Sequence, residues 1–224
     1  SEYCFMRQIF LFTAGLPIAR AHLGDSILNA VPFDKMRQHL GNEQVDYFQD
    51  LHPGEDGFYA WGAVPGKNNI PTWQKMQIGD LVLTVYDSTY HFVSTVTGKV
   101  HSQGLAKDIW GVDDEGKTWE YMYLLSKPQK VSLSIKAPEV AGRLRSLYQG
   151  FCRIGDPSVE GILAEFGSFD NFVEKIFKRA LPKPVIEQEL EQVQAEANTK
   201  DEFDPKSLSD GRSKVLREVV RRQG

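Results

Sequence analysis

The sequence predicts an α+β fold: a small, twisted, barrel-like sheet with flanking helices, followed by a helical segment and a linker helix. Two observations lead to this prediction. Between residues 58 and 135, short runs rich in β-branched and aromatic residues are separated by turn residues. Between residues 139 and 180, apolar residues recur instead at helical spacing. Strands and helices that fall into separate runs favour this fold over the alternating strand–helix units of a parallel sheet.

Two kinds of element are expected before the strand-rich region. Residues 8–13 form a short apolar run, which predicts a buried first strand. Asp25 or Ser26 is predicted to cap a short helix. Residues 32–40 carry apolar side chains at helical spacing and end at Gly41, so a second helix is expected there.

Five strands are predicted in the central region, each bounded by turn residues: Phe58–Gly62, Asp80–Tyr86, His91–Val100, Thr118–Leu125 and Val131–Ile135. The acidic run Asp113–Glu115 stands beside Gly116. We interpret it as a hairpin turn rather than as an acid/base pair.

Residues 139–180 are predicted to form helices that pack on the first domain, residues 1–138. Val140, Leu144 and Leu147 have helical spacing, and a second apolar stripe runs from 159 to 166. A third stripe follows Ser168, which is expected to be its cap; its members are Phe169, Phe172, Val173, Ile176 and Phe177.

The last segment, residues 181–224, is interpreted as an acidic linker followed by a basic helix. Seven acidic residues and one base, Lys200, lie between 187 and 204. After Pro205 the sign of the charge reverses, and Val215, Leu216, Val219 and Val220 form an apolar stripe.

Composition excludes several classes of function. The 224-residue chain has a net charge of −4, which argues against a wholly basic nucleic-acid coat but allows a local basic groove. No apolar run reaches the ~18 residues of a membrane span. Cys4 and Cys152 are far apart, so a reducing cytoplasm is a simpler expectation than a disulfide.

No catalytic constellation is present. The five histidines lack metal-ligand spacing, and no glycine-rich segment has the spacing of a phosphate-binding loop. We therefore expect no catalytic residues, no metal site and no cofactor in this chain.

The segment from Phe58 to Trp73 carries the clearest functional signal. An aromatic strand ends at Trp61 and opens into a turn rich in Gly, Pro and Asn, and Trp73 and a Gly-Asp turn follow. Two indoles bracketing small residues and amides can stack a planar ring and hydrogen-bond its edge. Two core tryptophans beside an irregular loop is the alternative that residue types alone leave open.

The order of these residues resembles the EVE domain of the PUA superfamily, which is related to the YTH domain. The resemblance continues through Leu105–Gly111 and Thr118–Leu124 and covers about residues 5 to 140. It implies a PUA-like fold and the binding of a modified base that has been flipped out of a nucleic acid.

The same resemblance implies the site residues. Trp61 would form one wall of an aromatic cage and Trp110, or an aromatic residue of the Tyr86 strand, the other. The full set expected at the modified base is Trp61, Gly62, Ala63, Asn68, Asn69, Tyr86, Asp87, Ser88, Phe92 and Trp110. Asp87 is expected either to accept a hydrogen bond from a cytosine amino group or to cap its turn. Trp73 and Trp119 are expected in the core. The nucleic-acid backbone would meet Lys67, Arg212, Lys214, Arg217, Arg221 and Arg222.

The tail from Phe203 to Gly224 is similar to the lead-in before the nuclease domain of HNH endonucleases that carry a separate specificity domain. The resemblance implies a modification-dependent (type IV) restriction endonuclease, whose HNH domain would need a divalent metal. Modified cytosine, as 5-methylcytosine or 5-hydroxymethylcytosine, in double-stranded DNA is the favoured ligand. N6-methyladenine, and a free-standing protein that binds modified RNA, remain alternatives, and a homodimer through the C-terminal part is left open.

Overall fold

The computed structural model describes residues 7–183 and 192–193. Two compact units divide the chain, Ser1–Leu181 and Pro182–Gly224. The sheet and the helices described below all belong to the first unit. The predictions for the basic segment after Pro205, including the five of its cations that are expected to contact the nucleic-acid backbone, lie outside the described residues.

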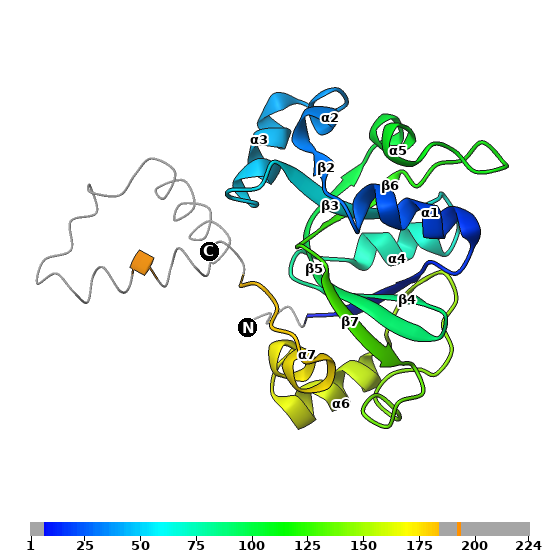
Figure 1. The fold of residues 1–224 in the computed structure, drawn as a ribbon, viewed down its shortest axis with the longest axis vertical. Coiled ribbons are helices and arrows are strands. Elements are labelled where there is room, and N and C mark those ends of the chain that lie inside the picture. The colour runs from blue at the N-terminus through cyan, green and yellow to red at the C-terminus, as the bar shows by residue number, and fades with distance from the viewer. Residues whose placement is uncertain (1–6, 184–191, 194–224) are drawn as a thin grey trace, which may run out of the picture. The chain divides into compact units, whose positions relative to one another are not determined.

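Eight strands form the sheet of the first unit (Figure 1): β1 Ile9–Thr13, β2 Val31–Pro32, β3 Gly57–Ala63, β4 Leu81–Tyr86, β5 Thr89–His101, β6 Tyr121–Leu125, β7 Gln129–Ser134 and β8 Phe151–Arg153. They pair in the order β2-β3-β6-β5-β4-β1-β8, and β7 pairs with β5. The β1–β4 pair is parallel, and the other pairs are antiparallel. The predicted α+β fold with a twisted sheet is confirmed, but the pairing order runs from β2 to β8 without closing on itself.

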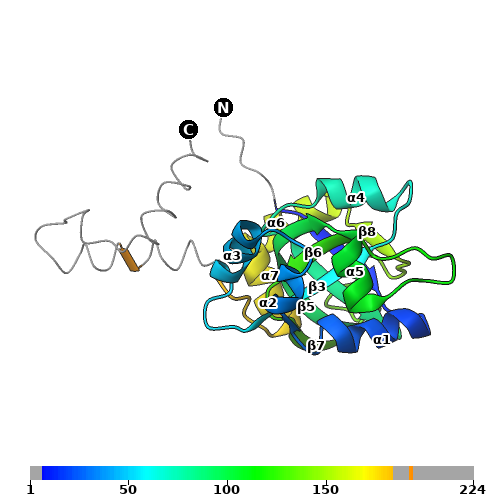
Figure 2. The same ribbon diagram turned by 90° about the horizontal axis from the view of Figure 1, so that it is seen from above.

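Within residues 7–183, seven helices flank the sheet: α1 Pro17–Ser26, α2 Phe33–Arg37, α3 Asn42–Asp50, α4 Asn69–Lys75, α5 Gln103–Trp110, α6 Asp156–Phe166 and α7 Phe169–Phe177. Helices α6 and α7 lie together at one end of the unit, and α2, α3 and α5 lie toward the other (Figure 1). Seen from above, α1 and α4 are on opposite sides of the strands (Figure 2).

Strand β1 is buried on both faces, which explains its unbroken apolar run. Ile9 and Leu11 pack into a core with the apolar faces of α6 and α7. Phe10 and Phe12 point to the opposite face, into a second core that contains Trp61. Burial on both faces removes the polar alternation that a half-exposed strand would show.

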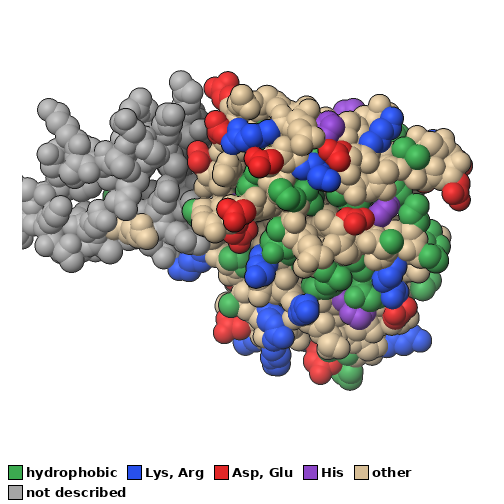
Figure 3. Space-filling model, turned by 45° about the horizontal axis from the view of Figure 1, so that its top comes forward, with side chains coloured by type: hydrophobic (Ala, Val, Ile, Leu, Met, Phe, Trp, Pro, Cys, Tyr) green, Lys and Arg blue, Asp and Glu red, His purple; other side chains and the backbone are tan. Residues whose placement is uncertain are grey.

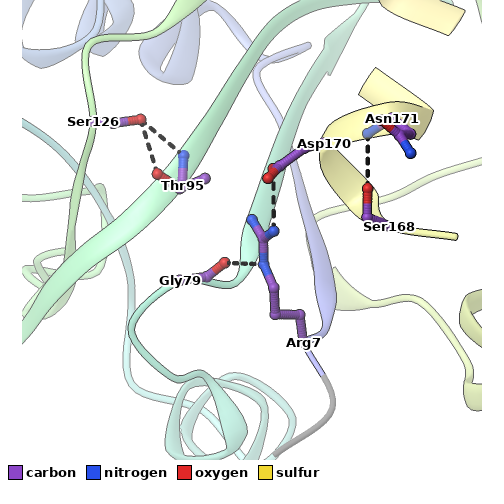
Figure 4. A network of polar contacts seen from close by, with 7 residues as sticks. All are labelled: Arg7, Gly79, Thr95, Ser126, Ser168, Asp170 and Asn171. Carbon is purple, nitrogen blue, oxygen red and sulfur yellow. Dashed lines mark hydrogen bonds and ion pairs between the residues drawn. The ribbon is translucent and has the colours of Figure 1, made fainter. Parts of the chain in front are cut away.

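Polar contacts connect the start of the chain to α7 (Figure 4). The Arg7 guanidinium donates to the Gly79 carbonyl at 2.8 Å and to Asp170 on α7 at 3.2 Å. The hydroxyl of Ser168 accepts a hydrogen bond from the Asn171 N–H at 3.1 Å, so Ser168 is the N-cap of α7, as predicted.

Most of the predicted elements are confirmed. The first strand and the five later strands lie within a few residues of their expected bounds. The helix expected over 32–40 is α2, which ends at Arg37, and the stripes after residues 159 and 168 are α6 and α7. A turn is present at Asp113, whose carboxylate accepts hydrogen bonds from the N–H groups of Glu115 and Lys117. It is not a hairpin turn as predicted, because it lies between α5 and β6 and does not join two strands.

Two other predictions are wrong. Ser26 does not begin a helix but ends α1, and its hydroxyl donates to the Ala60 carbonyl at 2.6 Å. The helix expected over 139–150 is a series of turns, in which Gly142 has a φ of 77°. Val140 and Leu144 are buried as their spacing suggested, but a left-handed glycine between them is incompatible with a helix. The loop after Ala63, in turn, contains α4, which the sequence analysis missed.

Candidate functional site

Three tryptophans surround one histidine between α1, β3 and α5; we call Trp61, Trp110, Trp119 and His22 the tryptophan cluster. The centroid of the His22 ring lies 4.3 Å from that of Trp119, with the planes at 84°. The His22 ring lies 6.4 Å from the Trp61 ring and 6.3 Å from the Trp110 ring. Trp61 and Trp110 themselves meet edge to face at 6.3 Å. The two tryptophans predicted as cage walls are therefore neighbours.

Phe12 of β1 covers one face of Trp61. Their ring centroids are 4.4 Å apart and the planes differ by 15°, which is a stacked arrangement. Trp61 is only 5% exposed, Trp110 7% and His22 6%. These three side chains are thus buried, and a flat ring could be inserted among them only if they separate.

Hydrogen bonds fix one side of the cluster. The Trp110 indole N–H donates to the Ser26 hydroxyl at 3.2 Å, and that hydroxyl donates to the Ala60 carbonyl. This chain of bonds connects α5, α1 and β3. It holds Trp110 at the place where β3 delivers Trp61.

The surroundings of His22 favour the neutral form of its imidazole. Burial lowers its pKa, while the charge of Asp25 and a hydrogen bond to the Trp110 backbone oppose the shift. A neutral imidazole has one donor and one acceptor nitrogen, so it can pair with the edge of a base. His22 is not among the residues expected at the modified base. Its position among the tryptophans is a tertiary effect that no local pattern of the sequence signals.

Gly62 is required by close packing. A Cβ at this position would lie 2.2 Å from the Trp119 carbonyl oxygen. The absence of a side chain lets the segment before β6 approach β3, which brings Trp119 into the cluster. Trp119 was expected in the core; it is half-buried and contacts His22. Trp73, also expected in the core, is half-buried and donates to the Met122 carbonyl.

The residues expected at the modified base or the DNA backbone in and after the end of β3 differ in solvent exposure and in hydrogen bonding. Ala63 is buried, and the Asn69 amide donates to the Val64 carbonyl at 3.0 Å, which stabilises the loop. Asn68 and Lys67 are exposed. Asn68 and Lys67 therefore leave their side chains to solvent, whereas Asn69 contributes to the fold of the loop.

The residues expected on the β4–β5 turn lie outside the tryptophan cluster. Tyr86 stacks on His91, and its other face meets the Arg20 guanidinium of α1. Asp87 and Ser88 form the exposed tip, whereas Phe92 is buried in the core. The turn is nevertheless close to the end of β1, because the Ala14 N–H donates to the Val85 carbonyl. Helix α1 contacts both places, through Arg20 and through His22.

Charge and metal ligands give limited signals. On the face shown in Figure 3, Lys and Arg side chains alternate with Asp and Glu, and hydrophobic side chains lie between them.

Within residues 7–183 and 192–193, no three His, Cys, Asp or Glu residues are grouped to hold a metal ion. In that same part of the chain, no helix has the length and apolar character needed to cross a bilayer. The described thiol, Cys152, is free, and Cys4 lies outside the described residues.

Comparison with known proteins supports the fold. No known family and no curated protein matches the sequence. Among solved structures, the chain is similar to the N-terminal domain of Thermococcus gammatolerans McrB bound to m5C DNA, with 17% sequence identity and a TM-score of 0.53. The match covers 72% of this chain and 98% of that domain. The likeness shows that this chain shares the fold of that domain.

Proposed function

We propose that this chain recognises a modified cytosine in double-stranded DNA, and that it does so by accepting the flipped base among the rings of the tryptophan cluster. The observation that carries the proposal is this cluster of three indoles around a histidine. It occurs in a fold shared with a domain bound to m5C DNA. Aromatic rings and an imidazole can supply the two interactions that a flipped base needs, which are contact with its faces and hydrogen bonds to its edge.

Stacking is large enough to make flipping feasible. A base stacked on an aromatic side chain is stabilised by about 1–3 kcal/mol, against an unstacking cost of a few kcal/mol. Burial of the extra methyl of 5-methylcytosine adds about 0.8 kcal/mol. We therefore expect a preference for the modified base of several-fold to about tenfold, rather than absolute discrimination.

Insertion of a base requires the cluster to open. Trp61 already has Phe12 on one face, so the base would take the space on the side of His22 and Trp110. His22 is on α1, and displacement of this helix would separate the imidazole from all three indoles at once. In the open state, His22 is positioned to read the edge of the base.

The recognition unit would direct a nuclease. The resemblance of residues 203–224 to the lead-in of HNH endonucleases supports this role, and the metal-dependent chemistry would belong to the nuclease domain. A protein that acts on DNA with a free thiol is best placed in the cytoplasm. Self-association through the C-terminal part is a further proposal that concerns residues outside the described structure.

Binding to matched oligonucleotides tests the proposal. Duplexes with a single cytosine, 5-methylcytosine, 5-hydroxymethylcytosine or N6-methyladenine are compared by titration, together with the same modified base opposite a mismatch. Modified cytosine should bind most tightly, and more tightly still at a mismatch, because flipping is less costly there. Equal affinity for every duplex, or a preference for single-stranded RNA, would refute the proposal. A preference for N6-methyladenine would show that the recognised base is methyladenine and not modified cytosine.

Conservative tryptophan variants locate the site. Trp61→Phe keeps an aromatic ring in the core but shortens the stacking surface, and it should reduce the preference for modified DNA. Trp73→Phe is the matched control, because Trp73 lies outside the cluster and donates to the Met122 carbonyl instead. Retention of the full preference in Trp61→Phe and Trp110→Phe, with folding confirmed by circular dichroism, would place the modified base elsewhere.

A further inference from the structure

Arg20 is the outermost member of a three-layer stack beside the tryptophan cluster. Its guanidinium carbon lies 4.1 Å from the centroid of the Tyr86 ring. On the other side, Tyr86 stacks on His91 at 3.6 Å with an interplanar angle of 6°. The Arg20 side chain remains 41% exposed, so its outer face is open to a partner.

Hydrogen bonds hold the guanidinium in one plane and leave donors unused. Arg20 Nε donates to the Ala14 carbonyl at 3.1 Å, and Nη2 donates to Asp87 Oδ1 at 3.1 Å. An arginine has five N–H donors in a fixed fork. Within the described part of the chain, three of the five therefore have no acceptor. Such a fork matches the oxygens of a phosphate group.

The turn that carries Asp87 is a tight hairpin. Asp87 and Ser88 are the two residues between Tyr86 and Thr89, the paired ends of β4 and β5, and they have positive φ values of 50° and 53°. Positive φ at both positions is what a two-residue type I′ turn requires. Arg20 contacts this turn through the Tyr86 ring and the Asp87 carboxylate, which hold the guanidinium beside it.

Arg20 is also close to the tryptophan cluster along the backbone. Its acceptor Ala14 follows Phe12 by two residues, and Phe12 stacks on Trp61. Two residues of extended chain span roughly 7 Å. On α1, His22 follows Arg20 by two residues and enters the cluster itself. One helix thus presents a cation outside the cluster and an imidazole inside it.

We infer that Arg20 binds a backbone phosphate of DNA next to the nucleotide whose base enters the tryptophan cluster. The inference rests on the proposed function. In the free protein, the Asp87 carboxylate orients the guanidinium and also repels an approaching phosphate. Arg20 therefore contributes affinity that is independent of base modification, whereas the cluster contributes the preference.

The salt dependence of binding tests the inference. Dissociation constants for 5-methylcytosine and cytosine duplexes are measured for wild type and Arg20→Gln between 50 and 200 mM salt. Loss of one phosphate contact should lower the slope of log K against log salt by about 0.9. The affinity advantage of the wild type should accordingly shrink about 3.5-fold across this range, with the preference for methylated DNA unchanged.

Two further variants complete the test. Arg37→Gln is the matched control, because Arg37 is also ion-paired, to Asp46, but lies on α2; its slope should equal that of the wild type. Asp87→Asn removes the repelling charge and should tighten binding of both duplexes about two- to fivefold.

The outcomes separate the inference from the proposed function. An unchanged slope in Arg20→Gln, with the methylated preference intact, would overturn the phosphate contact and leave the proposed function standing. Asp87→Asn could lose the preference for 5-methylcytosine over cytosine while Arg20→Gln keeps the wild-type salt slope. That result would also overturn the phosphate contact, because the turn would then contact the base. If the wild type shows no preference for modified DNA at any salt concentration, the proposed function fails first.

Discussion

Gly62→Ala tests whether close backbone packing builds the tryptophan cluster. The new Cβ would lie 2.2 Å from the Trp119 carbonyl oxygen and 3.1 Å from the Trp119 Cβ, whereas ordinary contacts begin at 3.4 Å. The segment that carries Trp119 must therefore move by about 1 Å, and backbone cannot rotate away as a flexible side chain can. Overpacking of this kind costs about 1–3 kcal/mol.

We expect the upper half of that range, about 2–3 kcal/mol, because the clash is with backbone. For a unit of this size, 1 kcal/mol corresponds to about 2–4 °C in Tm, so Gly62→Ala should melt about 4–12 °C below wild type. The assay is thermal denaturation followed by circular dichroism, with tryptophan fluorescence as a second probe because the indole of Trp119 should move.

Gly66→Ala is the matched control. Its Cβ would meet only the Asn69 amide nitrogen, at 3.9 Å, and should change Tm by no more than 2 °C. If Gly62→Ala melts like Gly66→Ala, the Trp119 segment can yield without cost. The explanation of this glycine by packing would then be refuted.

Three other perturbations follow from the structure. His22→Gln should make the Tm fall less steeply on acidification. Because the pKa of His22 is lowered in the folded protein, its contribution to the free energy of unfolding is complete above about pH 6.5 and is lost as the pH falls below that value. An equal slope of Tm between pH 7 and 5 in wild type and variant would contradict this. Asp80→Ala removes the carboxylate that accepts hydrogen bonds from the backbone N–H groups of Gln8 and Gln77. It should lower the free energy of unfolding in urea titrations by about 2–4 kcal/mol, and Asp80→Asn should lie between Asp80→Ala and wild type. A change below about 1 kcal/mol would show that water replaces the carboxylate. Ser168→Ala removes the N-cap of α7 and should cost about 1 kcal/mol, whereas Ser168→Asp should retain stability, and equal melting of all three proteins would exclude a capping role.

The strands could be predicted because their signals are local. Each central strand is bounded by turn residues, and the run in β1 is apolar throughout because both of its faces are buried. Helix α4 could not be predicted in the same way. It contains Pro71, has no side-chain cap and buries none of its residues fully, so it shows neither a start signal nor an apolar stripe.

The site was predictable only in part. Trp61 could be recognised at the end of a predicted strand. Trp110 was expected only from the family resemblance, because the helix that it ends, α5, was not predicted. The roles of Phe12 and His22 depend on strand pairing and on the path of α1, which bring distant residues into contact. Residues separated by about 40 to 100 positions meet here, and helical or strand periodicity holds no information over such distances.

The closed state of the tryptophan cluster makes recognition a question of conformational populations. A ligand that binds only an open form has an apparent dissociation constant equal to its intrinsic one divided by the open fraction. If one molecule in a hundred is open, affinity for every base falls about 100-fold, while the ratio between modified and unmodified bases stays the same. On the proposed function, substitutions in the Ser26 hydrogen bonds that join Trp110 to β3 would therefore shift the overall affinity for DNA without changing which base is preferred.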